Sequence, residues 1–154
     1  MAKVLTVFFL SMVPLLELRG AIVAGSLAGL PWYVSYIVSV IGNILPVPVI
    51  LLFVRRVFSY MKTRGGRLER IALWFENKGA SKSDKVTKYA TFGLFLFVAI
   101  PLPGTGAWMG SLIAALMNMR LKHSLISVFL GILTAGLIMS LACYGIISGL
   151  DFLF

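Results

Sequence analysis

Three long stretches of the chain carry no formal charge, and they constrain the fold more than any other feature. Residues 20–54, 89–119 and 123–150 contain no Asp, Glu, Lys or Arg. A membrane-spanning helix needs about 20 mostly apolar residues, so each stretch is long enough to cross a bilayer. Of all residues, 60% are hydrophobic and 12% charged, far from the balance of soluble domains. The sequence therefore predicts an all-α integral membrane protein.

The N-terminal segment allows two interpretations. Lys3 followed by the apolar run 4–16 has the layout of a signal peptide. Glu17 and Arg19 stand where a signal peptide has small cleavage-site residues, which favours a retained membrane segment. The single cysteine, Cys143, excludes a disulfide within the chain.

The net charge of +9 is concentrated in one segment. Ten of the fourteen Lys and Arg residues lie in residues 55–88. Basic loops stay on the cytoplasmic side and attract anionic headgroups, so we expect membrane lipids as partners and no nucleic acid. Within this loop, residues 67–78 have the apolar spacing of an amphipathic helix lying in the headgroup region. These features predict a multi-pass protein of a cell membrane, with a prokaryotic inner or plasma membrane favoured.

The apolar stretch 89–119 is bounded by basic residues at both ends. A continuous helix of this length would be about 46 Å long, whereas the hydrocarbon core is about 30 Å thick. Its middle, Pro101-Leu102-Pro103-Gly104-Thr105-Gly106, interrupts a helix. We expect a re-entrant helical hairpin that returns to the cytoplasmic side, followed by a full crossing at 125–147. The alternative is one long kinked helix with Arg120 and Lys122 on the far side.

The first half has the same order of elements. The polar break at 13–20 corresponds to the second loop. The small residues at 25–30 correspond to residues 110–116, and the crossing around 39–45 to residues 127–133, at separations of 85 to 88 residues. Each half, with one hairpin and one crossing, crosses an odd number of times. The second copy should then be inverted, an arrangement that recurs among secondary transporters. We expect one membrane domain, 1–154, with repeats 1–54 and 89–154 joined by the basic loop 55–88.

Glu17 and Arg19 are the charges that lie deep in an apolar setting. Each would cost at least about 2.5–3.5 kcal/mol in hydrocarbon, so both should face protein or water. Glu17 is a candidate proton carrier and Arg19, next to Gly20, a candidate anion contact. The alternatives are a structural ion pair between them, or Arg19 reaching the headgroups.

Two uncharged positions are further candidates. The backbone N–H groups of Gly104-Thr105-Gly106, which follow Pro101 and Pro103, suit an anionic headgroup, although these residues also permit simple close packing. Asn43 precedes Pro46 and Pro48, which should kink its helix. Its side chain could line a cavity or hydrogen-bond between helices.

The sequence contains none of the common catalytic, metal-binding or nucleotide-binding motifs. Hydrolysis by a pair of carboxylates would need a second acid at depth beside Glu17. We therefore expect no enzyme activity, no cofactor and no metal. Small residues around Gly25-Ser26 and Gly110-Ser111 permit close helix packing, and we expect a homodimer or larger oligomer.

The segments Glu17-Leu18-Arg19-Gly20-Ala21 and 101–108 resemble the small multidrug export protein family. That family is similar in layout to the DedA and SNARE-associated Golgi protein (VTT) superfamily. The resemblance covers nearly the whole chain and implies two re-entrant hairpins, inverted repeats and a transport role. By position, Glu17 and Arg19 match the first motif, and Pro101, Pro103, Gly104, Thr105 and Gly106 match the second.

For the DedA relatives, the resemblance implies movement of phospholipid or polyprenyl-phosphate carriers, with membrane carboxylates and arginines important. This sequence lacks their arginine in or just after the second loop before Arg120, which weakens a phosphate-lipid substrate. Two hypotheses of different classes remain. One is a transporter of an amphipathic or lipid-like solute, proton-linked through Glu17. The other is a non-transporting membrane scaffold whose basic loop recruits lipid or partners.

Overall fold

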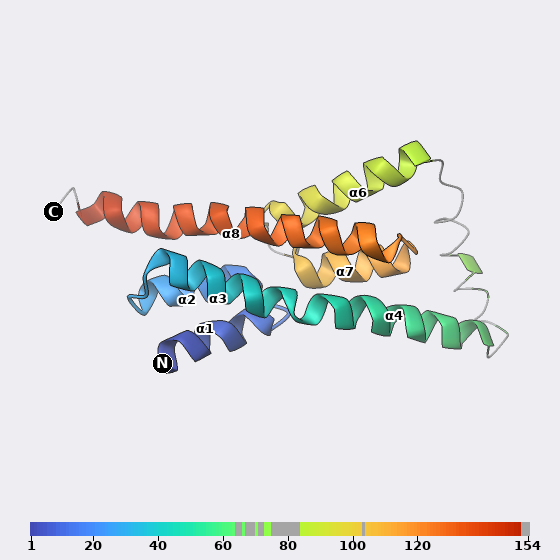
Figure 1. The fold of residues 1–154 in the computed structure, drawn as a ribbon, viewed down its shortest axis with the longest axis horizontal. Coiled ribbons are helices and arrows are strands. Elements are labelled where there is room, and N and C mark those ends of the chain that lie inside the picture. Colours follow the sequence, from blue (N-terminus) through green and yellow to red (C-terminus); the bar gives the residue numbers. More distant parts are fainter. Residues whose placement is uncertain (64–65, 67–69, 71–72, 75–83, 103, 152–154) are drawn as a thin grey trace.

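The computed structural model describes residues 1–63, 66, 70, 73–74, 84–102 and 104–151. Within these ranges the chain is helical and contains no strand, which confirms the predicted all-α class (Figure 1). The helices are α1 (Ala2–Met12), α2 (Glu17–Leu27), α3 (Trp32–Ile44), α4 (Pro46–Thr63), α6 (Asp84–Ala99), α7 (Ala107–Leu116) and α8 (Leu121–Asp151). The predicted interfacial helix at 67–78 lies largely outside the described residues.

Two segments are long and apolar enough to cross a membrane. They are Trp32–Met61, with mean hydropathy 2.5, and Leu121–Gly145, with mean hydropathy 2.3. The first comprises α3 and most of α4, which are separated by Leu45 alone. Pro46 and Pro48 have no N–H to donate to the preceding turn, which accounts for the interruption at the position where the sequence predicts a kink.

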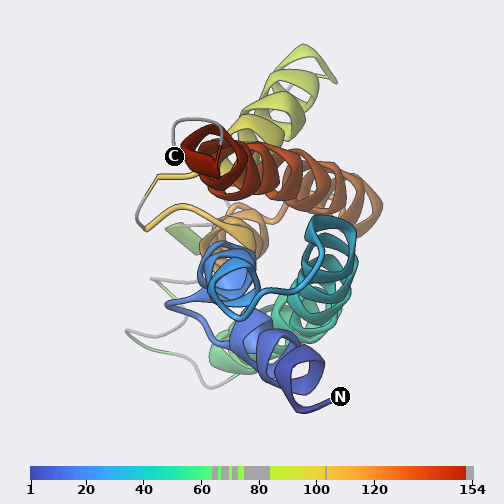
Figure 2. The same cartoon turned by 90° about the vertical axis from the view of Figure 1, so that its left-hand side faces the viewer.

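The other helices form two hairpins. Helices α1 and α2 are joined by a turn at residues 13–16, and α6 and α7 by a loop at residues 100–106. The chain reverses direction between α6 and α7, so the stretch 89–119 is not one kinked helix (Figure 1). Figure 1 also shows the N- and C-termini at one end of the long axis and the end of α4 and start of α6 at the other. In the view along this axis, α1 (dark blue) and α6 (yellow-green) lie on opposite sides, with α2 in front of α7 between them (Figure 2).

The hairpins pack on the long helices through small and aliphatic side chains. The buried core includes Leu18 and Ile22 of α2 and Val128 and Ile132 of α8, each at most 1% exposed. Large apolar side chains also cover the outer surface of α3, among them Ile37 and Ile41, each about half exposed. An apolar outer surface of this kind is compatible with lipid contact.

Glycines allow the closest helix contacts in both halves. A Cβ built at Gly42 of α3 would lie 2.7 Å from the Phe8 carbonyl oxygen of α1. A Cβ at Gly131 of α8 would lie 3.1 Å from the Phe95 carbonyl oxygen of α6. In each half, therefore, a glycine of the long helix packs against the backbone of the first hairpin helix.

Helices α2 and α7 end in the same way. The Leu30 N–H donates to the Gly25 carbonyl and the Met119 N–H to the Ala114 carbonyl, both at 3.0 Å. Gly29 (φ +72°) and Asn118 (φ +48°) occupy the left-handed position of these C-terminal caps. Corresponding residues are 89 apart here, whereas matching the sequence segments gives 85 to 88. Short apolar segments of similar composition can match when they are shifted by one to four residues.

Candidate functional site

The first turn holds Glu17 in an uncommon backbone conformation. Glu17 begins α2 with φ +49°, and its N–H donates to the Val13 carbonyl at 2.8 Å. A left-handed conformation in a residue other than glycine costs on the order of 1–3 kcal/mol and persists where surrounding contacts enforce it. The Glu17 side chain is only 6% exposed, so those contacts are internal to the protein.

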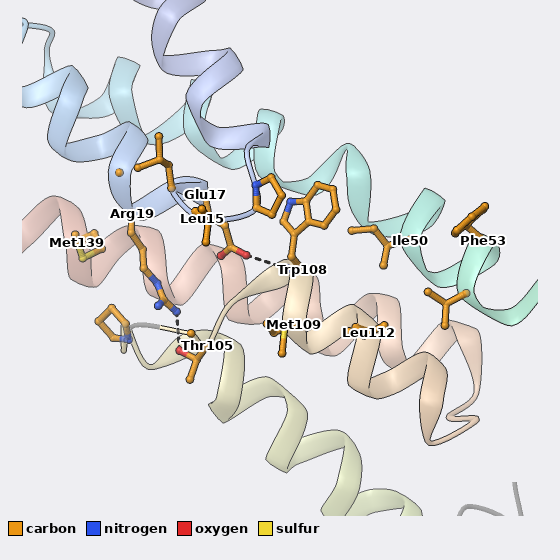
Figure 3. A pocket seen from close by; sticks show the side chains of 16 residues that line it. Leu15, Glu17, Arg19, Ile50, Phe53, Thr105, Trp108, Met109, Leu112 and Met139 are labelled. Carbon is orange, nitrogen blue, oxygen red and sulfur yellow. Dashed lines mark hydrogen bonds between the residues drawn. The ribbon is translucent and has the colours of Figure 1, made fainter. Parts of the chain in front are cut away.

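The Glu17 carboxylate lies at the N-terminus of α7. It accepts the Ala107 N–H at Oε2, 3.3 Å away, and the Trp108 N–H at Oε1, 3.1 Å away (Figure 3). The first turn of a helix has N–H groups without intrahelical acceptors and carries partial positive charge. Glu17 therefore caps a helix that begins about 90 residues later in the chain.

Gly106 makes room for this carboxylate. A Cβ at Gly106 would lie 2.0 Å from Glu17 Oε2, and the backbone has φ +150°. Gly104 also has a positive φ, +82°, but a Cβ there would meet nothing within 4 Å. Glycine is thus required at 104 by the backbone alone, and at 106 by both the backbone and the carboxylate.

Arg19 binds the other end of the interrupted segment. Its guanidinium donates to the Leu102 carbonyl, to the Ile100 carbonyl at 3.1 Å and to Thr105 Oγ1 at 2.9 Å (Figure 3). The Thr105 hydroxyl in turn lies 2.9 Å from each of these two carbonyl oxygens. Because carbonyls at a helix C-terminus carry partial negative charge, the guanidinium compensates the end of α6.

Glu17 and Arg19 do not form an ion pair with each other. The hydrogen bonds of the two side chains go instead to opposite ends of the break between α6 and α7. The arrangement therefore differs from both sequence-based alternatives, a structural pair and an arginine that reaches the headgroups. Glu17 binds the N–H groups of Ala107 and Trp108, which directly follow the Gly104-Thr105-Gly106 segment considered above for an anionic headgroup.

A cavity of about 770 Å³ adjoins these contacts. Its polar wall consists of Glu17, Arg19 and Thr105, and its apolar wall comes from α4, α7 and α8 through Ile50, Phe53, Val54, Met109, Leu112 and Met139 (Figure 3). The indole of Trp108 also lines the cavity, and its Nε1 is buried without a hydrogen-bond partner among the described residues. The site is therefore an apolar space with a small charged corner.

The remaining sequence candidates divide into two groups. Gly20, Pro101 and Gly104 line the cavity together with Glu17, Arg19 and Thr105. Pro103 lies outside the described residues. Asn43 is buried on α3 at 2% exposure and does not line this cavity. Its Oδ1 has no hydrogen-bond partner in the part of the chain that the structure describes.

Sequence reasoning missed one residue of the site, Trp108, and one residue that binds just beyond the end of α7, Arg55. Trp108 contributes both a backbone donor for Glu17 and a cavity wall. Arg55 of α4 donates to the Met119 carbonyl just after α7, so this short helix has a carboxylate at its start and a guanidinium at its end. Arg55 is the first charged residue after the apolar stretch 20–54, and that position was the available signal.

A family model described as "Putative small multi-drug export protein" matches residues 17–138. The match begins at Glu17, contains the loop at residues 100–106, and ends within α8. No curated protein and no solved structure matches the chain.

Proposed function

The chain belongs to the family of small multi-drug export proteins, and we propose that it is a secondary-transporter-like membrane protein that moves an amphipathic or lipid-like solute. The observation that carries the proposal is the position of the charged contacts beside an apolar cavity. Glu17 and Arg19, at the start of α2, bind the two ends of the connection between α6 and α7. Both side chains also line the cavity of about 770 Å³.

The proposed membrane arrangement has two re-entrant hairpins that enter from opposite sides as inverted repeats. It is supported by the groove that Lys88 and Arg120 both line. Lys88 is near the start of α6 and Arg120 follows the end of α7, so these two points of the chain lie on the same side. It is further supported by the constant separation of 89 residues between the caps of α2 and α7. In this arrangement residues 55–88 and 120–123 are cytoplasmic and the N-terminal hairpin enters from outside.

The proposed cycle separates the two turns. Glu17 and Arg19, at the start of α2, bind the start of α7 and the loop at 100–106. Separating α2 from this connection breaks both sets of contacts together and changes access to the cavity. Hydrogen bonds to an ionised acceptor are about twice as strong as neutral ones. Protonation of Glu17 would therefore weaken its hold on α7 and couple opening to proton uptake.

The cavity suggests the class of solute. Its volume falls in the range of about 300–1,000 Å³ typical of sites for small molecules. The walls are mainly apolar, with polar groups at one corner near Glu17 and Arg19, which suits a molecule with an apolar body and one polar end. We propose no catalytic step, since Glu17 is the only acid among the described residues that line the cavity.

Flux through reconstituted protein tests the proposal. Vesicles containing the full chain are loaded with ethidium or with a fluorescent phosphatidylcholine, and movement of each probe is followed with and without a pH gradient. Wild-type protein should move at least one probe faster under the gradient. Folded Glu17→Gln protein should lose this acceleration, whereas Asp84→Asn, which also replaces a carboxylate by an amide but in the basic segment 55–88, should keep it.

Two outcomes would contradict parts of the proposal. Gradient-dependent flux that is unchanged in Glu17→Gln would exclude Glu17 as the proton carrier. Absence of flux for both probes in folded wild-type protein would favour the scaffold hypothesis, in which deletion of residues 62–88 alone should abolish function. We also propose a homo-oligomer, which native mass measurement in lipid would contradict by finding a monomer.

A further inference from the structure

A second cavity, of about 610 Å³, lies between α6 and α8 and shares no residue with the cavity beside Glu17. Its α6 wall consists of residues at helical spacing, Lys88, Thr91, Phe92 and Phe95. Its α8 wall has the same spacing, His123, Ile126, Ser127 and Leu130, with Arg120 just before the helix. Residues three, four and seven apart lie on one helix face, so two parallel stripes form the groove.

Polarity changes along this groove from one end to the other. Lys88, Arg120 and His123 are exposed at the start of the two helices, and their side chains form no hydrogen bond or ion pair with another described residue. Further along, Phe92 is 58% and Leu130 46% exposed. The distance from residue 123 to residue 130 along α8 is about 10 Å. The groove therefore runs from a cationic end to an apolar end about 10 Å further along α8.

The shape of the groove follows from one close helix contact. A Cβ at Gly131 would lie 2.6 Å from Val98 Cβ, so α6 and α8 touch at this point. From there α6 diverges from α8 toward its own start (Figure 1). The Ser127 hydroxyl, which donates to the Thr91 carbonyl at 3.0 Å, links the two helices at the floor. The result is a wedge that opens at the basic end.

We propose that this groove binds one anionic phospholipid. The phosphate lies among Lys88, Arg120 and His123, and an acyl chain lies along Phe92, Phe95, Ile126 and Leu130. Lys88 and Arg120 are two cations without a partner among the described residues, so they attract an anionic headgroup, to which the His123 ring can donate a hydrogen bond. The adjoining apolar stripe matches the chain that a lipid carries. A free phosphate would leave the apolar wall unoccupied. A second copy of this chain would bring its own net charge of +9 against a basic rim.

Lipid retention by the full chain tests this site. Purified protein is mixed with equal amounts of phosphatidylglycerol and phosphatidylcholine of identical acyl chains, and bound lipid is counted by native mass spectrometry. Wild-type protein should retain phosphatidylglycerol in preference. Arg120→Gln should lower that retention about fivefold, in line with the contribution of one basic residue near an anionic surface. Lys122→Gln is the matched control, because Lys122 is exposed and close in sequence but does not line the groove.

A second variant separates lipid from phosphate binding. Leu130→Trp should fill the apolar end and lower phosphatidylglycerol retention while leaving the cations in place. Normal retention in Leu130→Trp together with displacement of the lipid by inorganic phosphate would overturn the lipid site in favour of a simple anion site. Equal losses in Arg120→Gln and Lys122→Gln, or equal retention of both lipids by wild type, would overturn it in favour of non-specific attraction. None of these outcomes depends on transport activity.

Discussion

The Glu17 carboxylate occupies the position that a side chain at Gly106 would take. A Cβ at position 106 would lie 2.0 Å from one carboxylate oxygen and 2.7 Å from the carboxylate carbon. These two residues come from different halves of the chain, and their fit lets the carboxylate reach the first two N–H groups of α7. The glycine of one turn is therefore part of the binding site for the acid of the other. This relationship makes the contact between the turns sensitive to a single methyl group.

Gly106→Ala should destabilise the protein more than Gly104→Ala. Both positions have positive φ, and a residue other than glycine in such a conformation costs about 1–3 kcal/mol. At 106 alone the methyl group also meets Glu17, which adds about 1–3 kcal/mol for overpacking. The free energy of unfolding in mixed detergent, followed by circular dichroism, gives the comparison. Equal losses at the two positions would contradict the fit between Gly106 and Glu17.

Glu17→Ala should partly rescue Gly106→Ala. The three nearest atoms to the added methyl group all belong to the Glu17 carboxylate, so removing the carboxylate removes the collision. A double-mutant cycle should give a coupling energy of about 0.5–3 kcal/mol, as expected for residues in contact. Additive losses would show that the methyl group at 106 acts through the backbone alone.

Glu17→Gln and Arg19→Gln should each lower stability, and the double variant should lower it further. Each change removes hydrogen bonds of a charged group, worth about 1.5–3 kcal/mol. Because the two side chains hold the same connection between α6 and α7, the loss in the double variant should differ from the sum by about 0.5–3 kcal/mol. Unfolding of the three variants in detergent measures this. Recovery of stability in the double variant would instead identify a structural ion pair.

Thr105→Val should weaken the loop, and Thr105→Ser should not. The hydroxyl accepts from Arg19 and lies within hydrogen-bond distance of the Ile100 and Leu102 carbonyls. Valine keeps the shape but leaves these groups without the hydroxyl, at a cost of about 1–3 kcal/mol. Serine retains it. Similar melting temperatures for the valine and serine variants would show that the hydroxyl contributes little.

Gly131→Ala should destabilise the contact of α8 with α6, whereas Gly93→Ala should be neutral or slightly stabilising. A methyl group at 131 would lie 2.6 Å from Val98 Cβ, but one at 93 meets nothing within 4 Å. Overpacking at the helix contact should cost about 1–3 kcal/mol. At the exposed site, alanine is the better helix former by about 1 kcal/mol. Thermal unfolding of both variants checks the difference.

Ser83→Cys and His123→Cys, made separately in a Cys143→Ser background, should react from the same, cytoplasmic side. The reason is that basic segments remain in the cytoplasm and that Lys88 and His123 line one groove. A membrane-impermeant maleimide applied to oriented vesicles, before and after detergent, measures the side. Labelling from opposite sides would contradict the re-entrant hairpin and leave simple crossings.

The sequence alone determined the class of fold and the positions of its interruptions. Charge-free stretches can be identified without any structure. Because backbone N–H and carbonyl groups in lipid must be hydrogen-bonded within the protein, such stretches form helices. Pro46 and Pro48 interrupt α3–α4 and the 101–106 segment separates α6 from α7, since proline lacks an N–H wherever it occurs. These are local consequences of residue type, which explains why reading along the chain was sufficient.

Only the tertiary structure decided what Glu17 and Arg19 bind. Their partners lie 81 to 91 residues away, and backbone N–H and carbonyl groups are present at every position, so no side-chain pattern marks them. The structure was likewise needed to match residues of the first half with residues of the second. The corresponding glycine contacts and helix caps are 89 residues apart, whereas the apolar sequence alone matches equally well at a separation of 85. Sequence identified the charges that must be satisfied, and folding brought the two helix ends that satisfy them into reach.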